Sequence, residues 1–205
     1  MEMDDLAKDF VISFFDTQLS LHGDRPEALR WSPTGQRMHY ESLLDIGNIE
    51  GGKVLDYGCG KGDFYQFLID KGISVEYSGF DINDKLIALA KTKFPGADFR
   101  VFDIEEDKLE EDFDYIFLCG VFNLKVQGLD DTIKNTLIRL FKRCHRALAF
   151  NALSAHNPKK DFELHYTSPE EVFAFAAEKL SPILSLRHDR MFYDFVLFVY
   201  RNINP

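Results

Sequence analysis

The sequence predicts an α/β fold: a mostly parallel β-sheet with helices packed on both of its faces. Short apolar segments typical of strands alternate with amphipathic helical patterns along the chain, and repeated strand–helix units build such a sheet. Residues 113–118 form an apolar run typical of a strand that is buried on both faces. Only a few residues separate the last two expected strands. They are too few for a helical crossover, so we expect these strands to pair antiparallel.

The first 50 residues are expected to form two helices ahead of the first strand. Apolar residues from Leu6 to Leu19 recur at helical spacing, which predicts an amphipathic helix. Residues 22–33 are interrupted by glycine and proline, so we expect a loop there. A second helix is expected at about residues 34–49.

The rest of the chain is expected to alternate strands with helices. The expected strands span residues 53–57, 75–80, 99–102, 113–118, 147–151, 183–187 and 195–201. The expected helices span residues 62–71, 83–94 and 130–143, and a further helix begins after Ser168. Ser168 and Glu171 form a capping box around Pro169, a pattern typical of the first turn of a helix. The final hairpin is expected to add one antiparallel strand to the sheet.

Length and composition indicate a single domain, residues 1–205, with its own hydrophobic core. The chain is 45% hydrophobic and contains 20 phenylalanines and 8 tyrosines, a composition that excludes a disordered chain. No apolar segment approaches the ~18–20 residues that span a bilayer. The amino terminus is acidic, which is unlike a secretory signal.

Charge and cysteine content narrow the expected partners. The chain carries 24 lysines and arginines against 34 acidic residues, a net charge of −10. Nucleic acids and anionic membrane surfaces attract basic proteins, so we expect neither as a partner. The three cysteines are widely spaced and odd in number. This argues against a disulfide framework or a metal site and favours a reducing, cytoplasmic setting.

The turn after the first expected strand, Gly58-Cys59-Gly60-Lys61-Gly62, is the strongest indication of a ligand site. Ligands of open parallel sheets bind beyond the carboxyl ends of the strands, and glycines let backbone N–H groups approach them. A dinucleotide site requires a glycine at the position of Asp63. A negative charge on Asp56 would also repel the negatively charged pyrophosphate of a dinucleotide. A nicotinamide-dependent oxidoreductase therefore remains only an alternative, as does a loop without a ligand.

Two carboxylates end the next two expected strands. Asp81 lies about 20 residues beyond the glycine turn, where a carboxylate can accept hydrogen bonds from both hydroxyls of a ribose. The alternative is a helix N-cap, which Asn83 can already supply. Asp103, at the end of the third expected strand, can accept a hydrogen bond from the exocyclic amine of an adenine, with Ile104 against the adenine ring. The alternative is that Asp103 is a turn carboxylate without a ligand.

These segments together resemble a known family. VLDYGCGKG, GFDIN, FRVFDI and FDYIFLCGVFN, at these intervals, are similar to class I S-adenosylmethionine-dependent methyltransferases. The resemblance runs from about Arg37 to the carboxyl terminus. It implies a Rossmann-like sheet of order 3-2-1-4-5-7-6 with strand seven antiparallel, and S-adenosylmethionine as the cofactor. The cofactor-binding residues that it implies are Asp56, Gly58, Cys59, Gly60, Asp81, Ile82, Asp103, Ile104, Cys119 and Gly120.

The resemblance also implies the reaction, transfer of a methyl group to an O, N or C acceptor. It does not specify the substrate; the small size and acidic charge of the chain favour a small molecule over a nucleic acid, with a protein substrate as an alternative. Methyl transfer relies on alignment of the reactants, and aromatic faces accommodate the sulfonium, so no metal is required. Residues 1–50 would form a partial lid over a core of residues 51–205. Trp31 either covers the site or anchors the first helix. Arg37 is a candidate for the cofactor carboxylate, the alternative being a solvated arginine.

Candidate catalytic residues are less well defined. Asp189 can fix a tautomer of His188, which makes this pair the most enzyme-like constellation outside the glycine turn; a structural network is the alternative. His165 lies in a loop expected to face the site, and Asn123 can orient a polar acceptor. Methyltransferases that modify C5 of a nucleic-acid base use a cysteine that follows a proline as nucleophile. Cys119 has no preceding proline, so we expect it to be inert. A non-catalytic partner protein remains an alternative function, and the sequence leaves the oligomeric state open.

Overall fold

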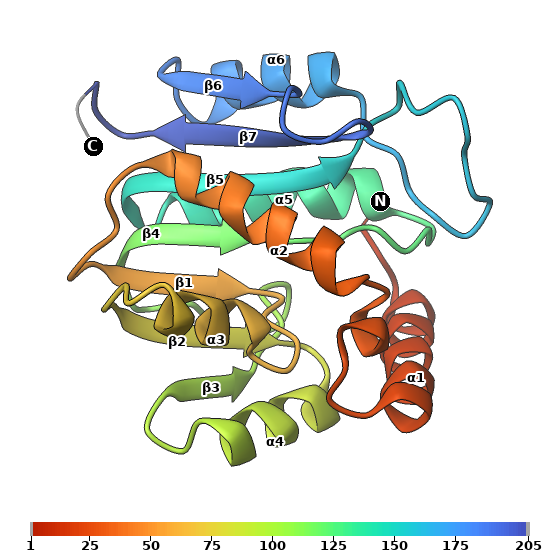
Figure 1. The fold of residues 1–205 in the computed structure, drawn as a ribbon. Helices are drawn as coiled ribbons and strands as arrows, with labels where there is room; N and C mark the ends of the chain where they lie inside the picture. The colour runs from red at the N-terminus through yellow and green to blue at the C-terminus, as the bar shows by residue number, and fades with distance from the viewer. Residues whose placement is uncertain (1, 204–205) are drawn as a thin grey trace.

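The computed structural model describes residues 2–203, which contain one seven-stranded sheet. Its order, β3-β2-β1-β4-β5-β7-β6, is the predicted one (Figure 1). The strands are β1 (Lys53–Tyr57), β2 (Glu76–Asp81), β3 (Asp98–Val101), β4 (Phe113–Leu118), β5 (Cys144–Leu153), β6 (Leu184–Arg187) and β7 (Asp194–Tyr200). Strand β7 is antiparallel to both of its neighbours, whereas the pairs among β1 to β5 are parallel.

Helices cover both faces of the sheet, as predicted (Figure 1). They are α1 (Asp5–His22), α2 (Pro33–Leu43), α3 (Asp63–Asp70), α4 (Asp84–Lys93), α5 (Leu129–Phe141) and α6 (Pro169–Lys179), with short 3₁₀ turns η1 (Pro26–Leu29) and η2 (Leu44–Ile46). Helices α5 and α6 pack on one face and α2, α3 and α4 on the other. Ser168 caps α6 by accepting a hydrogen bond from the Glu171 N–H at 3.2 Å.

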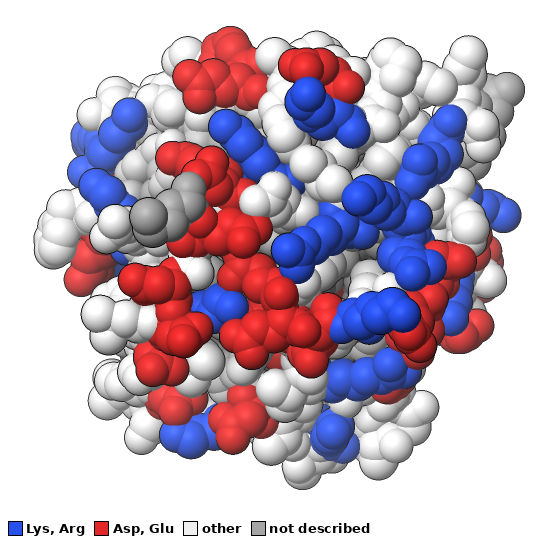
Figure 2. Space-filling view, turned by 180° about the vertical axis from the view of Figure 1, so that it is seen from behind, with Lys and Arg blue, Asp and Glu red and all other residues white. Residues whose placement is uncertain are grey.

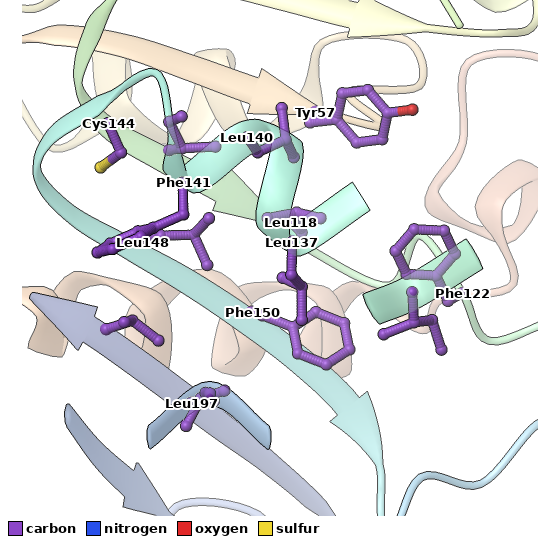
Figure 3. Packing of buried hydrophobic residues seen from close by; sticks show 14 of the residues in the cluster. Tyr57, Leu118, Phe122, Leu137, Leu140, Phe141, Cys144, Leu148, Phe150 and Leu197 are labelled. Atoms are coloured by element: carbon purple, nitrogen blue, oxygen red, sulfur yellow. The ribbon is translucent and has the colours of Figure 1, made fainter. Parts of the chain in front are cut away.

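The two hydrophobic clusters follow the alternation of side chains along each strand. In β1, Leu55 belongs to the cluster under α5, and Val54 belongs to the cluster under α2 and α3. Figure 3 shows Leu137 of α5 among Leu118 and Phe150 of the sheet. Because both faces are buried, the strands read as the apolar runs seen in the sequence.

Two expected elements differ from the observed ones. The second helix ends at Leu43 rather than at residue 49 and continues as the 3₁₀ turn η2, because Gly47 at φ 129° breaks the helix. Strand β5 spans ten residues, longer than expected, because β4 pairs with it on one edge and β7 on the other. The loop expected at residues 22–33 holds the turn η1.

Helix α1 lies at the carboxyl ends of the central strands (Figure 1). Asp4 caps it by accepting from the Ala7 N–H at 2.9 Å. None of its residues is buried, and Leu6 and Phe10 on its outer side are largely exposed. Within the described residues, no helix is sufficiently long and apolar to cross a membrane. Helix α1 is therefore a surface element placed where ligands of such sheets bind.

Candidate functional site

A cavity lies at the carboxyl ends of β1, β2 and β4, beneath α1. Helix α1 contributes Val11, Ile12 and Phe15 to its wall. The predicted cofactor-binding residues that line it are Gly58, Gly60, Asp81, Ile82, Asp103, Cys119 and Gly120. The fold thus brings these residues together at one cavity, although Gly58 and Gly120 are 62 positions apart in the sequence.

The glycine turn after β1 needs glycine for steric reasons at two positions. Gly58 has φ 76°, and a Cβ there would lie 2.5 Å from the side chain of Val121. Gly60 has φ 55°, and its Cβ would lie 2.9 Å from Leu29. Both φ values are in the left-handed region that disfavours other residues. The turn consequently presents bare backbone to the cavity.

Asp63 occupies the position of the third glycine of a dinucleotide motif. Its carboxylate binds the buried ammonium of Lys61, at 2.7 and 2.6 Å, and the amide of Gln36 at 2.9 Å. Lys93 adds an ion pair at 3.1 Å. Asp63 thus carries a charged network at the position that a dinucleotide motif reserves for glycine.

Asp81 joins the glycine turn to the start of α4. Its Oδ2 accepts from the Gly60 N–H at 2.8 Å, and its Oδ1 accepts from the Asn83 N–H at 2.9 Å. Asn83 itself caps α4 by accepting from the Leu86 N–H at 2.9 Å, so the N-cap alternative for Asp81 is wrong. Burial raises the pKa of Asp81. The backbone N–H of Ile82 also binds this carboxylate; because a carboxylate has about four acceptor sites, Asp81 retains capacity for a ligand in the cavity.

Asp103 is held by a residue that the sequence analysis missed. Lys8 of α1 places its Nζ 2.6 Å from Asp103, 3.0 Å from Glu105 and 3.2 Å from Glu106. Burial lowers the pKa of Lys8, but the hydrogen bonds to these three carboxylates outweigh it and raise the pKa above its usual range. Helical spacing could have pointed to Lys8 from the sequence, because Lys8 shares one face of α1 with Ile12 and Phe15.

The wall at the end of β4 combines backbone with an aromatic side chain. The Gly120 N–H donates to Oδ1 of Asn151 at 2.6 Å. A Cβ at Gly120 would lie 2.6 Å from the ring of Trp31. Trp31 lines the cavity and packs on His39, with 4.3 Å between ring centroids. His39 in turn contacts the carbonyl of Gly35 at 2.6 Å and is hydrogen-bonded to the carboxylate of Asp194. Trp31 therefore faces the site.

Three predicted cofactor-binding residues lie behind the cavity wall. Asp56 accepts a hydrogen bond from the Tyr77 hydroxyl at 2.6 Å, on the face of the sheet that α2 and α3 cover. Burial raises the pKa of Asp56 to about 7. Cys59 is buried beneath the turn, with Sγ 3.7 Å from the Gly60 carbonyl. Ile104 is buried in the core under α5. These residues support the wall from outside it.

Arg37 does not reach the cavity. It lies on the exposed side of α2 and binds Glu41 one helical turn later, at 3.1 Å. The buried residues of α2 include Gln36 and His39, so the helix turns Arg37 outward. The structure therefore favours the alternative of a solvated arginine.

The expected pair of His188 and Asp189 does not form. Asp189 accepts two hydrogen bonds from Arg187, at 3.1 and 2.8 Å. His188 packs near Phe195, with 6.3 Å between ring centroids, and its Nε2 is buried without a hydrogen-bond partner among the described residues. Residues two apart in an extended segment share a side, and this favours Arg187 as the partner of Asp189.

His165 and Asn123 come together through the backbone. The His165 N–H donates to the Asn123 carbonyl at 2.9 Å. The His165 Nε2 lies 3.2 Å from Asp130 without the geometry of a hydrogen bond, and burial lowers its pKa. Asn123 is near the site, because its Nδ2 would be 3.4 Å from a Cβ at Gly120. His165 lies outside the cavity lining.

Comparison with known proteins places this geometry in a family. A family model described as a methyltransferase domain matches residues 49–162. A Mycobacterium tuberculosis protein named as a methyltransferase is 29% identical over 155 residues, which cover 71% of this chain and 91% of the relative. The Bacillus subtilis methyltransferase YqeM is 26% identical over 160 residues, 70% of this chain and 61% of the relative. The chain thus spans most of the first relative but under two thirds of the second.

Solved structures share the fold. Magnesium protoporphyrin IX methyltransferase from Synechocystis, crystallised with S-adenosylhomocysteine, superposes with a TM-score of 0.68 at 17% identity. That match covers 95% of this chain and all of the other. The complex of DhpI with SAM and HEP superposes with a TM-score of 0.70 at 15% identity and covers 98% of this chain and all of the other.

Proposed function

The chain belongs to the methyltransferase domain family, and from that premise we propose that it transfers the methyl group of S-adenosylmethionine to a small-molecule acceptor. One observation carries the proposal: the Asp81 carboxylate binds the Gly60 backbone inside a cavity that α1 covers. This arrangement joins a glycine turn to a carboxylate able to accept from ribose hydroxyls.

The cavity fits this cofactor in shape and in charge. Gly58 and Gly60 carry no side chain, so the backbone itself lines the cavity at both positions. Asp81 is available to the ribose, Ile82 lies beside it on the wall, and Asp103 accepts at the far end. S-adenosylmethionine carries a net positive charge, and acidic side chains outnumber basic ones in the lining. When bound, the cofactor supplies a methyl group on a sulfonium, which is a good leaving group.

The chain's own contribution is alignment and exclusion of water. Val11, Ile12 and Phe15 of α1 present an apolar surface to the cavity, and we propose that residues 1–50 act as its lid. Trp31, fixed between Gly120 and His39, closes the end next to β4. Holding two reactants in line is worth ~7–11 kcal/mol of the barrier.

The proposed setting is the cytoplasm. Cys59, Cys119 and Cys144 are all free thiols in the structure, as a reducing compartment favours. The acidic net charge of −10 supports a small molecule rather than a nucleic acid as the acceptor.

Calorimetry with S-adenosylmethionine, S-adenosylhomocysteine and NADH tests the proposal. We expect wild-type protein to bind both adenosyl ligands but not NADH. Asp81→Ala removes charge-assisted hydrogen bonds worth ~1.5–3 kcal/mol, so it should weaken the affinity about 10- to 100-fold. Arg37→Ala is the matched control and should bind like wild type. Absence of binding by protein free of co-purified ligand would contradict the proposal.

A further inference from the structure

Trp31 enters the cavity wall from a turn with unusual backbone geometry. Arg30, the residue before it, has φ 60° and ψ 28° and is the only non-glycine residue of positions 2–203 with a positive φ. Residues with a side chain disfavour this left-handed conformation. The Trp31 N–H closes the turn by donating to the Pro26 carbonyl at 3.2 Å. The chain thus accepts backbone strain at the point where it places Trp31.

His39 lies behind the Trp31 ring, and both nitrogens of its imidazole face acceptors. Its Nδ1 lies 2.6 Å from the Gly35 carbonyl oxygen, and its Nε2 is hydrogen-bonded to Oδ2 of Asp194. A carbonyl oxygen can only accept a hydrogen bond, and so can an ionised carboxylate. A neutral imidazole carries one N–H and would turn a lone pair toward one of these oxygens. With a proton on each nitrogen, His39 donates to both.

The charge of this contact is shared by His39 and Asp194 alone. In water a carboxyl group releases its proton more readily than an imidazolium does, so the second proton belongs on His39. Two further titratable side chains near the contact are Cys119, which senses the charge of Asp194, and Tyr40 on α2. Burial raises the pKa of both groups well above their usual range, so both are uncharged.

The pair of His39 and Asp194 is buried, unlike the charged side chains at the molecular surface. Figure 2 shows many lysines, arginines, aspartates and glutamates exposed on the face that lies behind the sheet in Figure 1. Exposed pairs contribute little, because water and salt screen them. The side chains of His39 and Asp194 keep only 9% and 12% of their exposed area. Removal of one partner would leave the other charge buried without compensation.

The pair connects the last strand of the sheet to the β4 end of the cavity. Asp194 begins β7 and lies opposite Leu153, the last residue of β5. His39 lies on α2, which crosses one face of the sheet (Figure 1). With 4.3 Å between ring centroids, the imidazolium is within the range of a cation–π contact with Trp31. Trp31 in turn lines the cavity against Gly120, so a displaced His39 would displace the wall.

We propose that His39 is an imidazolium and that its ion pair with Asp194 positions Trp31 in the cofactor cavity, an inference that rests on the proposed function for the identity of the ligand. Neither His39 nor Asp194 lines the cavity, whose described lining residues fall between Met3 and Thr136. Both are therefore positioning residues that act through Trp31. Loss of the pair should loosen the wall without removing any side chain from it.

Nitrogen NMR of the histidine side chains tests the charge of His39. Asp194→Asn is the matched variant, because its amide can donate to Nε2 while a neutral His39 keeps its N–H on Nδ1. At pH 7 we expect two ring N–H groups on His39 in the wild type and one in the variant. A single ring N–H in the wild type, or the same His39 spectrum in both proteins, would overturn the inference.

Fluorescence tests the positioning, because Trp31 is the only tryptophan of the chain. Asp194→Ala leaves the imidazolium without its partner, so we expect emission at longer wavelength and stronger quenching by acrylamide than in the wild type. The affinity for S-adenosylhomocysteine should fall about 10-fold as the aromatic contact is loosened. Asp194→Asn should restore the emission and most of the affinity.

The same set of proteins separates this inference from the proposed function. NMR, emission and quenching need no ligand, whereas failure of the wild type to bind S-adenosylhomocysteine would contradict the proposed function. Wild-type emission and affinity in Asp194→Ala, shown to be folded by circular dichroism, would contradict the positioning role. If Asp194→Ala does not fold, the comparison of the wild type with Asp194→Asn by NMR decides the question.

Discussion

The glycine turn and helix α1 form opposite walls of one cavity, but they are held in different ways. The turn after β1 is fixed by backbone geometry and by Asp81, within 24 residues of sequence, from Gly58 to Asp81. Helix α1 has no buried residue and is fastened by side chains to partners far along the chain, as in the contact of Lys8 with Asp103. The turn is a rigid part of the sheet, whereas α1 is attached by polar contacts that can open separately.

Polar contacts fasten α1 along its length. Beyond Lys8, Asp16 accepts from Asn83 at 2.9 Å and pairs with Lys85. Just ahead of the helix, the Met3 N–H donates to Thr132 at 2.8 Å. Each of these hydrogen bonds replaces hydrogen bonds to water, so each contributes only ~0.5–1.5 kcal/mol to stability. We therefore expect α1 to open for ligand entry without unfolding of the sheet.

Substitution at the glycine turn should produce the largest effect. Gly58→Ala places a residue with a Cβ at φ 76°, a cost of ~1–2 kcal/mol. The collision with Val121 adds ~1–3 kcal/mol and closes the cavity. We expect denaturant unfolding to show the summed loss and calorimetry to show no cofactor binding.

Gly72→Ala is the matched control for this variant. Gly72 has φ 70°, but a Cβ there meets nothing within 4 Å. It should lose only the ~1–2 kcal/mol of backbone strain and keep wild-type affinity for S-adenosylmethionine. If both variants bound alike, the turn would not be the rigid wall that we describe.

Asp56, behind the turn, should make stability depend on pH. Burial raises the pKa of Asp56 to about 7, so the folded state retains a proton that the unfolded chain releases near pH 4. Stability contributed by Asp56 is therefore present below pH 4 and is lost as the pH rises to 7.

Asp56→Asn should remove this loss, because an amide oxygen still accepts from the Tyr77 hydroxyl at the same place. We expect the variant to gain roughly 1–3 kcal/mol over wild type at pH 8 relative to pH 5, since each pKa unit corresponds to ~1.4 kcal/mol. Urea unfolding at the two pH values measures the difference. Equal pH dependence of the two proteins would show that Asp56 is ionised in the fold.

Lys8→Ala should loosen α1 with little effect on the sheet. The variant leaves three carboxylates without their shared cation, at a cost between the ~0–1 kcal/mol of an exposed pair and the ~3–5 kcal/mol of a buried one. Hydrogen exchange should speed up in residues 5–22 while β1 and β4 stay protected. Faster exchange in the strands as well would mean that α1 and the sheet open together.

The smallest effect is expected for Lys85→Ala, a matched control on the same helix contact. Lys85 is exposed and pairs with Asp16, and exposed pairs contribute ~0–1 kcal/mol. Its exchange rates in α1 should stay within about two-fold of wild type. A change as large as that of Lys8→Ala would contradict the role we assign to burial.

The sequence predicted the part of the site that local patterns determine. The mostly parallel sheet, the glycine turn and Asp81 follow from strand–helix alternation and from residue types at strand ends, whereas the sheet order came from the family resemblance; the structure has that order and brings Gly58, Gly60 and Asp81 to one cavity. Contacts such as Lys8 with Asp103 span 95 residues and depend on how α1 docks, which no local pattern encodes. The expectation that Arg37 binds the cofactor carboxylate was not met for a related reason: the phase of helix α2 determines which of its sides faces inward.

A crystal structure of the chain with S-adenosylhomocysteine tests the central claim most directly. We predict the ribose hydroxyls within hydrogen-bond distance of Asp81, the adenine toward Asp103, and the homocysteine chain along Gly58 and Gly60, all beneath α1. A ligand bound elsewhere, or a ribose that does not contact Asp81 while the protein remains folded, would contradict the account.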